Sequence, residues 1–120
     1  MKKEEVYIYI EKVYDAKPEY LWKDDPTSAV FRNKKNQKWF GICMRVHGGK
    51  VGLKTDEFVD ILNVKMDPDL VMHLKTQKGY APAWHMNKEQ WITILLDGSV
   101  PEIQILDHID ASFELVDRRK

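Results

Sequence analysis

The clearest hydrophobic pattern in the chain lies in its last third. Residues 91–96 are apolar or β-branched, a run typical of one buried strand and too short to cross a membrane. Ser99 and Glu102 have the spacing of a capping box around Pro101, which predicts that a helix starts there. Apolar positions then recur every three or four residues, at Ile103, Leu106, Ile109, Phe113 and Val116. The pattern predicts a strand, a tight turn and a packing helix.

The first residues fit two patterns. Apolar side chains at Val6, Ile10 and Val13 form a helical stripe, but alternation through Ile8 would also suit a strand. Acidic residues at positions 4 and 5 favour a helix N-terminus, so the sequence predicts a helix over residues 4–14.

A β-hairpin is predicted next along the chain. Residues 29–32 and 39–46 are strand-like, and residues 33–37 join them. Asn33 and Asn36 in this connection tolerate the positive φ angles that a hairpin tip requires.

The middle of the chain predicts a strand followed by a helix. Residues 58–66 form the strand, and Asp67 and Pro68 suit the N-cap and first position of a helix. That helix would turn three apolar residues inward: Leu70, Val71 and Leu74. Residues 80–88 are predicted to form an irregular aromatic loop.

The predicted order is helix, strand, strand, strand, helix, strand, helix, with room for a short strand near Val51 or Ala83. Strands joined by short turns favour a mainly antiparallel sheet with helices packed on one face, an α+β, single-domain α/β sandwich. A chain of 120 residues with 43% hydrophobic content fits one domain over residues 1–120. The single Cys43 cannot form an internal disulfide, and no signal peptide or membrane span is evident, so we expect a cytoplasmic protein.

Several short sequence words occur in a distinctive order and spacing. They are AVFR at 29–32, KWF at 38–40, VDILNVK at 59–65, DPDL at 67–70, HMNK at 85–88 with Trp91, LDGSVP at 96–101 and IDASF at 109–113. Together they closely resemble the MmcQ/YjbR family of small bacterial proteins, over nearly the whole chain. The resemblance implies a CyaY-like fold and a DNA-binding role, and it brings no catalytic motif.

Charge is unevenly distributed along a chain whose formal net charge is zero. Between residues 26 and 55 there are seven basic residues and no acidic ones. A basic hairpin can contact DNA phosphates, and an aromatic residue in it can stack on bases. The nucleic-acid contacts predicted on this basis are Arg32, Lys34, Lys35, Lys38, Trp39, Arg45 and Lys88. The competing interpretation is that the lysines are simply solvated and protect a strand edge.

A ligand or protein partner could instead bind the aromatic loop. The residues proposed for this site are Trp84, His85, Asn87, Lys88 and Trp91. His85 is also the candidate general base if the protein is an enzyme, although no nucleophile lies near it in sequence. A simpler interpretation is that His85 and Asn87 fix the loop by hydrogen bonds to the backbone.

Metal binding is not expected. The four histidines lack ligand spacing, and one cysteine excludes a thiolate zinc site. The frataxin-like fold implied by the resemblance raises the question of iron, but lysines interrupt the acidic residues of the first helix. We therefore expect a non-catalytic protein without a cofactor, with DNA as the first partner, no membrane association, an unknown protein partner and a monomer by default.

Overall fold

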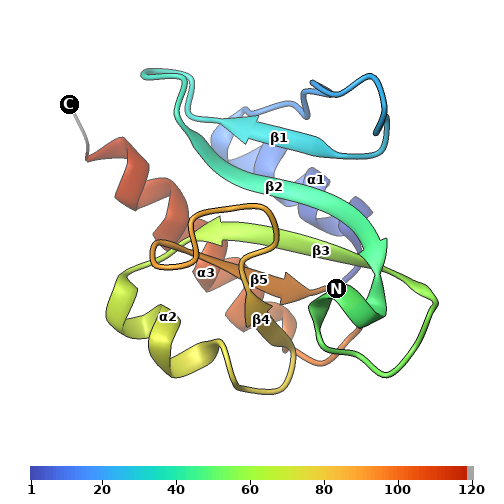
Figure 1. Ribbon diagram of the computed structural model, residues 1–120. Helices are drawn as coiled ribbons and strands as arrows, with labels where there is room; N and C mark the ends of the chain where they lie inside the picture. The colour runs from blue at the N-terminus through green and yellow to red at the C-terminus, as the bar shows by residue number, and fades with distance from the viewer. Residues whose placement is uncertain (119–120) are drawn as a thin grey trace.

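The computed structural model describes residues 1–118 and places five strands and three α-helices in this range (Figure 1). The elements follow one another as α1 (Lys3–Tyr14), β1 (Ala29–Arg32), β2 (Trp39–His47), η1 (Gly48–Val51), β3 (Phe58–Lys65), α2 (Pro68–Leu74), β4 (Tyr80–Pro82), β5 (Trp91–Leu95) and α3 (Glu102–Asp117). The predicted α+β class is confirmed, and the predicted order of elements holds with one additional strand, β4.

All strand pairs in the single sheet are antiparallel, in the order β1-β2-β3-β5-β4. The strand β4 occupies part of the segment predicted as an irregular loop, and pairs Ala81 with Thr93 of β5. It lies just before Ala83, where the sequence left room for a short strand. The sequence of β4, three residues ending in a proline, carries little strand signal. Its strand conformation depends on pairing with β5, which lies about ten residues further along the chain.

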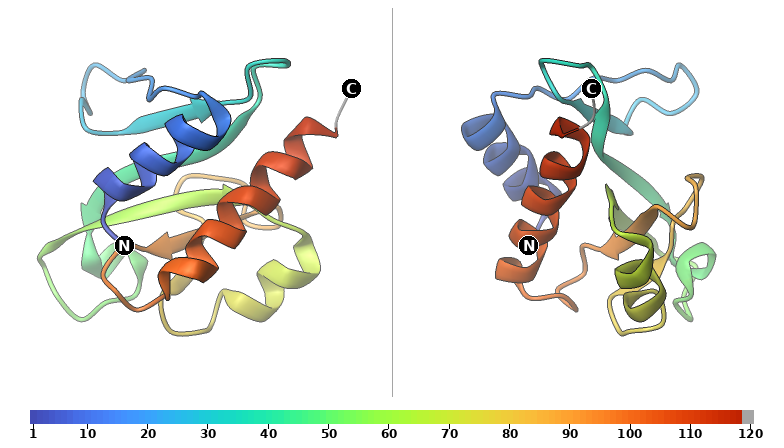
Figure 2. Two further views of the ribbon diagram at one scale, coloured as in Figure 1. Left: turned by 180° about the vertical axis from the view of Figure 1, so that it is seen from behind. Right: turned by 90° about the vertical axis from the view of Figure 1, so that its left-hand side faces the viewer.

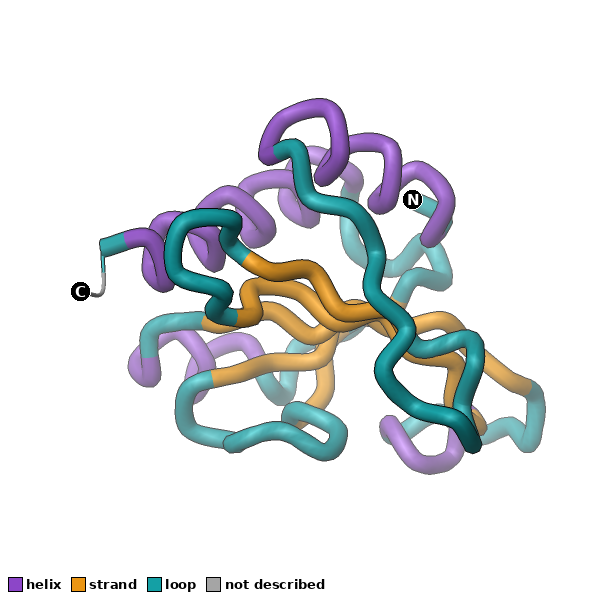
Figure 3. The backbone as a smooth tube through the Cα atoms, turned by 90° about the horizontal axis from the view of Figure 1, so that it is seen from above, coloured by secondary structure: helices purple, strands orange, loops and turns teal. Residues whose placement is uncertain are grey.

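The two long helices, α1 and α3, lie side by side across one face of the sheet (Figures 2 and 3). Their buried faces carry Val6 and Ile10 from α1, and Ile105, Ile109 and Val116 from α3. These side chains pack on the inward residues of the strands, among them Phe31, Phe40, Leu62, Val64, Ile92 and Ile94. This is the main core, and β1, β3 and β5 contribute alternate residues to it.

The opposite face is covered by loops and by η1, while α2 lies toward this side of the sheet (Figure 3). The connection between β4 and β5, residues 83–90, folds across it and buries Ala83 and Trp91 against Val30 and Ile42. A smaller apolar cluster contains Val46, Val51, Ile61, Ala81 and Leu95. Because loops cover this face instead of a helix, it retains a cleft.

Some expectations for α3 are wrong in detail. Ser99 does not cap the helix: Pro101 is the N-cap residue, and Ser99 donates its hydroxyl to Asp97. Ile103 is 71% exposed, and Ile105 takes the inward position instead. Asp97 accepts two bonds from Ser99 and so closes the turn locally, and the N-cap lies two residues later than predicted.

In α2, Val71 is buried as expected, but Leu70 is exposed. Asp67 caps this helix as predicted by accepting the amide of Asp69 at 3.0 Å. The helix has only seven residues, so one turn faces the core and Leu70 points outward.

Candidate functional site

The hairpin tip is tied to the rest of the protein through its lysines and asparagines. Lys34 Nζ lies 2.5 Å from Asp15 Oδ2, and Lys35 Nζ lies 3.3 Å from Asp117 Oδ1. The Lys34 hydrogen bond lowers the pKa of Asp15. Hydrogen bonds from Asn33 and Lys35 lower the pKa of Asp117. The positive charge of the tip is therefore offset by two carboxylates.

Asn33 and Asn36 do not take up the positive φ angle expected of them. That conformation belongs to Gln37, at φ 63°. The Asn33 amide donates to Asp117 Oδ1 at 2.8 Å, and the Asn36 amide donates to the Val116 carbonyl at 2.9 Å. Both asparagines therefore anchor the hairpin to the end of α3.

The remaining hairpin cations differ in their availability. Arg32 Nε lies 3.0 Å from Glu19 Oε2 and its guanidinium sits 5.7 Å from the centre of the Trp39 ring. Arg45 is 3.7 Å from Asp60 and stacks over Phe58. Lys38 is exposed, and its ammonium has no ion pair within residues 1–118. Of the five predicted phosphate contacts in the hairpin, four already have acidic partners.

Two residues predicted for the aromatic loop, Trp84 and Lys88, face a common cleft. His85, Asn87 and Trp91 do not line it. Trp91 is 8% exposed and belongs to the core, and Asn87 accepts the Glu89 amide to close a turn. His85 has φ 59° and sets its ring edge against Trp84.

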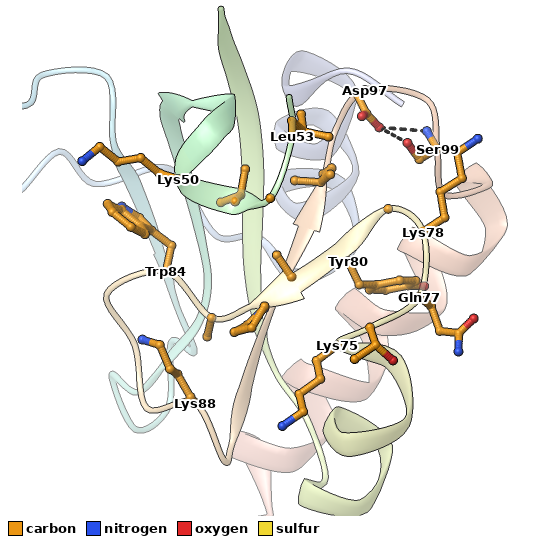
Figure 4. Close-up of a pocket in the computed structure, with 18 residues that line it drawn as sticks. Lys50, Leu53, Lys75, Gln77, Lys78, Tyr80, Trp84, Lys88, Asp97 and Ser99 are labelled. Atoms are coloured by element: carbon orange, nitrogen blue, oxygen red, sulfur yellow. Dashed lines mark hydrogen bonds between the residues drawn. The ribbon is translucent and has the colours of Figure 1, made fainter. Parts of the chain in front are cut away.

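The cleft lies on the face opposite α1 and α3, between η1, β4 and the end of α2 (Figure 4). Its volume is about 630 Å³. Apolar side chains line its floor, among them Val51, Leu53, Ala81 and Leu95. An apolar concavity of this size is typical of a small-molecule site.

Four lysines surround this cleft: Lys50, Lys75, Lys78 and Lys88. None of them forms an ion pair with a carboxylate in the described part of the chain. Lys50 Nζ lies 5.6 Å from the Trp84 ring centre, a cation–π contact that leaves its positive charge uncompensated. Asp97 is the acidic residue of the lining, and it accepts both the amide and the hydroxyl of Ser99 (Figure 4). The cleft is thus a concentration of positive charge over an apolar floor.

Buried polar side chains of the sheet hold Trp84 in position. Thr93 Oγ1 accepts the Trp84 amide at 2.9 Å and donates to Asn63 Oδ1. Asn63 Nδ2 donates to the Trp84 carbonyl at 3.0 Å. Asn63 and Thr93 are fully buried, so both backbone groups of Trp84 are fixed from beneath.

Tyr80 connects the cleft to α3. Its hydroxyl lies 2.8 Å from His108 Nε2, and the two rings meet edge to face. Burial lowers the pKa of His108 and raises that of Tyr80. Both groups are therefore neutral near pH 7, and the pair fixes one wall of the cleft without adding charge.

Sequence reasoning missed Lys50, Lys75 and Lys78 as members of one site. They lie in two segments, residue 50 and residues 75–78, which are 25 residues apart, and each segment is unremarkable by itself. The short strand β4 brings the segments together, and its sequence signal was the weakest of the five strands.

No group of three or more metal-ligating side chains occurs within residues 1–118. None of the helices described there is long and apolar enough to cross a membrane.

A family model described as YjbR matches residues 11–115. The Bacillus subtilis (strain 168) protein named uncharacterized protein YyaQ is 35% identical over 115 residues, which cover 96% of this chain and 98% of YyaQ. The Escherichia coli (strain K12) protein named uncharacterized protein YjbR is 39% identical over 54 residues, 44% of this chain and 46% of that protein.

Solved structures show the same fold. A crystal structure of a Pseudomonas syringae protein superimposes with a TM-score of 0.93 at 40% identity, covering 96% of this chain and 98% of that chain. The crystal structure of Deinococcus radiodurans protein DR2400 gives a TM-score of 0.74 at 20% identity, over 98% of this chain and 80% of that one, a likeness in fold alone.

Proposed function

The chain belongs to the YjbR family, and on this premise we propose that it is a non-catalytic binding protein for a small organic anion held in the lysine cleft. The observation that carries the proposal is the set of four lysines without acidic partners, within residues 1–118, around one apolar hollow. An ammonium group binds phosphate or carboxylate as a point charge.

The cleft also has the rigidity that a binding site needs. Trp84 is held by Thr93 and Asn63, and Tyr80 is held by His108. A preorganised wall reduces the entropy that the protein side chains lose when a ligand binds. The volume of 630 Å³ suits a small ligand, since such sites usually enclose about 300–1,000 Å³.

DNA binding through the hairpin has less support than the cleft. Arg32, Lys34, Lys35 and Arg45 would first have to leave carboxylates that already compensate their charge. Fewer uncompensated charges release fewer counterions, and this release supplies most of the affinity for nucleic acid.

The test is a titration of ¹⁵N-labelled protein with sodium pyrophosphate, at low and at physiological ionic strength. We expect amide shifts at Gly79 and Trp84 and at the Trp84 indole. Changing both Lys75 and Lys88 to Gln should weaken binding by about tenfold, because half of the positive charge of the cleft is lost. The matched control, Lys34→Gln with Lys35→Gln, removes the same charge from the hairpin and should bind as the wild type does.

Two results would overturn the proposal. One is the absence of shifts around the cleft at low salt, and the other is equal weakening in both double variants. A parallel titration with a short oligodeoxythymidine tests the nucleic-acid alternative. Shifts at Lys38 and Trp39 in that titration, with none at the cleft, would indicate that nucleic acid binds at the hairpin.

A further inference from the structure

A second hollow lies directly beside the lysine cleft. Its lining comes from α2 and from the β4–β5 connection: Pro68, Val71, Met72, Lys75, Lys88 and Glu89. Its volume is about 310 Å³, half that of the cleft. Three of its six lining residues are apolar, and their side chains form the part that belongs to α2.

Lys75 and Lys88 belong to both hollows. One comes from the end of α2 and the other from the loop that carries Trp84, and both lie below Tyr80 and Trp84 in the view of Figure 4. An anionic group bound between these two ammonium groups would therefore sit at the junction of the cleft and the apolar hollow.

Met72 is the apolar residue that this arrangement leaves exposed, at 70%. A methionine is flexible and polarisable, so it can close over an apolar group of variable shape. Ile103 on α3 is equally exposed, at 71%, but lies outside both hollows. The two residues therefore form a natural pair for comparison.

We propose that the ligand of this site is an amphiphilic anion, with its charged group between Lys75 and Lys88 and an apolar chain in the hollow beside Met72. The inference rests on the proposed function of the lysine cleft and names the chemical class of its ligand. Glu89 at the rim favours a ligand with one compact anionic end, because a charge extended along the hollow would meet that carboxylate.

A peptide extending the sheet at β4 fits the site less well. This edge strand has three residues and ends at Pro82, which offers no amide hydrogen.

The test compares methyl phosphate with octyl phosphate, used below its micelle concentration, by the same amide-shift titration. The two ligands share the anionic group and differ in the apolar chain. We expect octyl phosphate to bind the wild type at least about tenfold more tightly, the gain for burying about two methylene groups. Met72→Gln, which replaces the apolar group without adding a charge beside Lys75, should remove this advantage and leave the affinity for methyl phosphate nearly unchanged.

The matched control is Ile103→Gln, which makes the same kind of change at an equally exposed position and should preserve the advantage. If methyl phosphate binds and octyl phosphate gains nothing, the inference fails while the proposed function stands. If neither phosphate binds, both fail. An advantage that survives Met72→Gln, or binding to phosphatidylglycerol vesicles without binding of octyl phosphate, would also overturn the inference.

Discussion

Ser112 lies in the middle of α3 with its hydroxyl turned toward the sheet. It accepts the amide of Lys65 at 2.9 Å and donates to the Phe40 carbonyl at 2.6 Å. The residue is fully buried, so no water can replace either bond. It therefore joins α3 to two strands, β3 and β2.

Ser112→Ala should therefore lower the free energy of unfolding by about 1–3 kcal/mol, because a buried amide and a buried carbonyl each lose a partner. Urea denaturation of the variant measures this loss. Ser99→Ala is the control, since it removes a bond in an exposed turn where water can substitute. Equal losses in the two variants would contradict the bridging role.

Tyr9 and Tyr14 both donate their hydroxyls to Asp110 Oδ1, at 2.7 and 2.5 Å. Burial, followed by the bond to Asp110, raises the pKa of Tyr9 to about 12 from the ordinary value of 10.0. The same causes raise the pKa of Tyr14. The folded state thus favours the protonated hydroxyls, and this contribution to stability is complete below pH 10.

We expect the free energy of unfolding to fall as the pH rises from about 10 towards 12, as the tyrosines ionise more readily in the unfolded chain. In Tyr9→Phe the fall should be shallower, because one of the ionising groups is gone. Urea midpoints at a series of alkaline pH values measure both curves. If the wild type and Tyr9→Phe lose stability equally steeply with pH, ionisation of Tyr9 does not cause the loss of stability at alkaline pH.

At the scale of elements, the hairpin and α3 stabilise each other. Asn36 accepts the Lys38 amide through Oδ1 and donates to the Val116 carbonyl through Nδ2, so one side chain shapes the tip and binds the helix end. The last carbonyls of a helix lack partners within it, and this bond satisfies one of them.

Asn36→Ala should increase hydrogen exchange in the hairpin tip and in the last turn of α3 together, with a stability loss of about 1 kcal/mol. Exchange measured by mass spectrometry on overlapping peptides resolves both segments. The control is Asn87→Ala, which removes a similar turn bond from the β4–β5 connection. Faster exchange at the tip alone would mean that the contact with α3 does not matter.

At the scale of the whole molecule, the two faces of the sheet are covered in different ways. Two long helices bury one face in an apolar core, whereas loops held by buried polar groups cover the other. An apolar core favours close packing without gaps, while a loop held at a few points can leave a cleft beside it.

Thr93→Val keeps the shape of the side chain but removes the acceptor of the Trp84 amide and the donor to Asn63. We expect a loss of about 1–3 kcal/mol in the free energy of unfolding and weaker pyrophosphate binding in the cleft. Thr76→Val is the control, because Thr76 lines the cleft but its hydroxyl has no hydrogen-bond partner within residues 1–118. Thermal unfolding measures the stability and amide-shift titration measures the binding. Unchanged binding in Thr93→Val would show that the hydrogen bonds of Thr93 do not position the cleft for its ligand.

Much of the fold was determined by local sequence alone. The β1–β2 hairpin, β3, the Asp67 cap of α2 and strand β5 follow from periodicity and turn chemistry that operate within a few residues. The tertiary structure decided which charges are available. Lys34 and Lys35 meet carboxylates far away in sequence, whereas Lys50, Lys75, Lys78 and Lys88 surround one cleft and form no ion pair within residues 1–118. Electrostatic pairing depends on distance in space, and sheet order, not spacing along the chain, sets that distance.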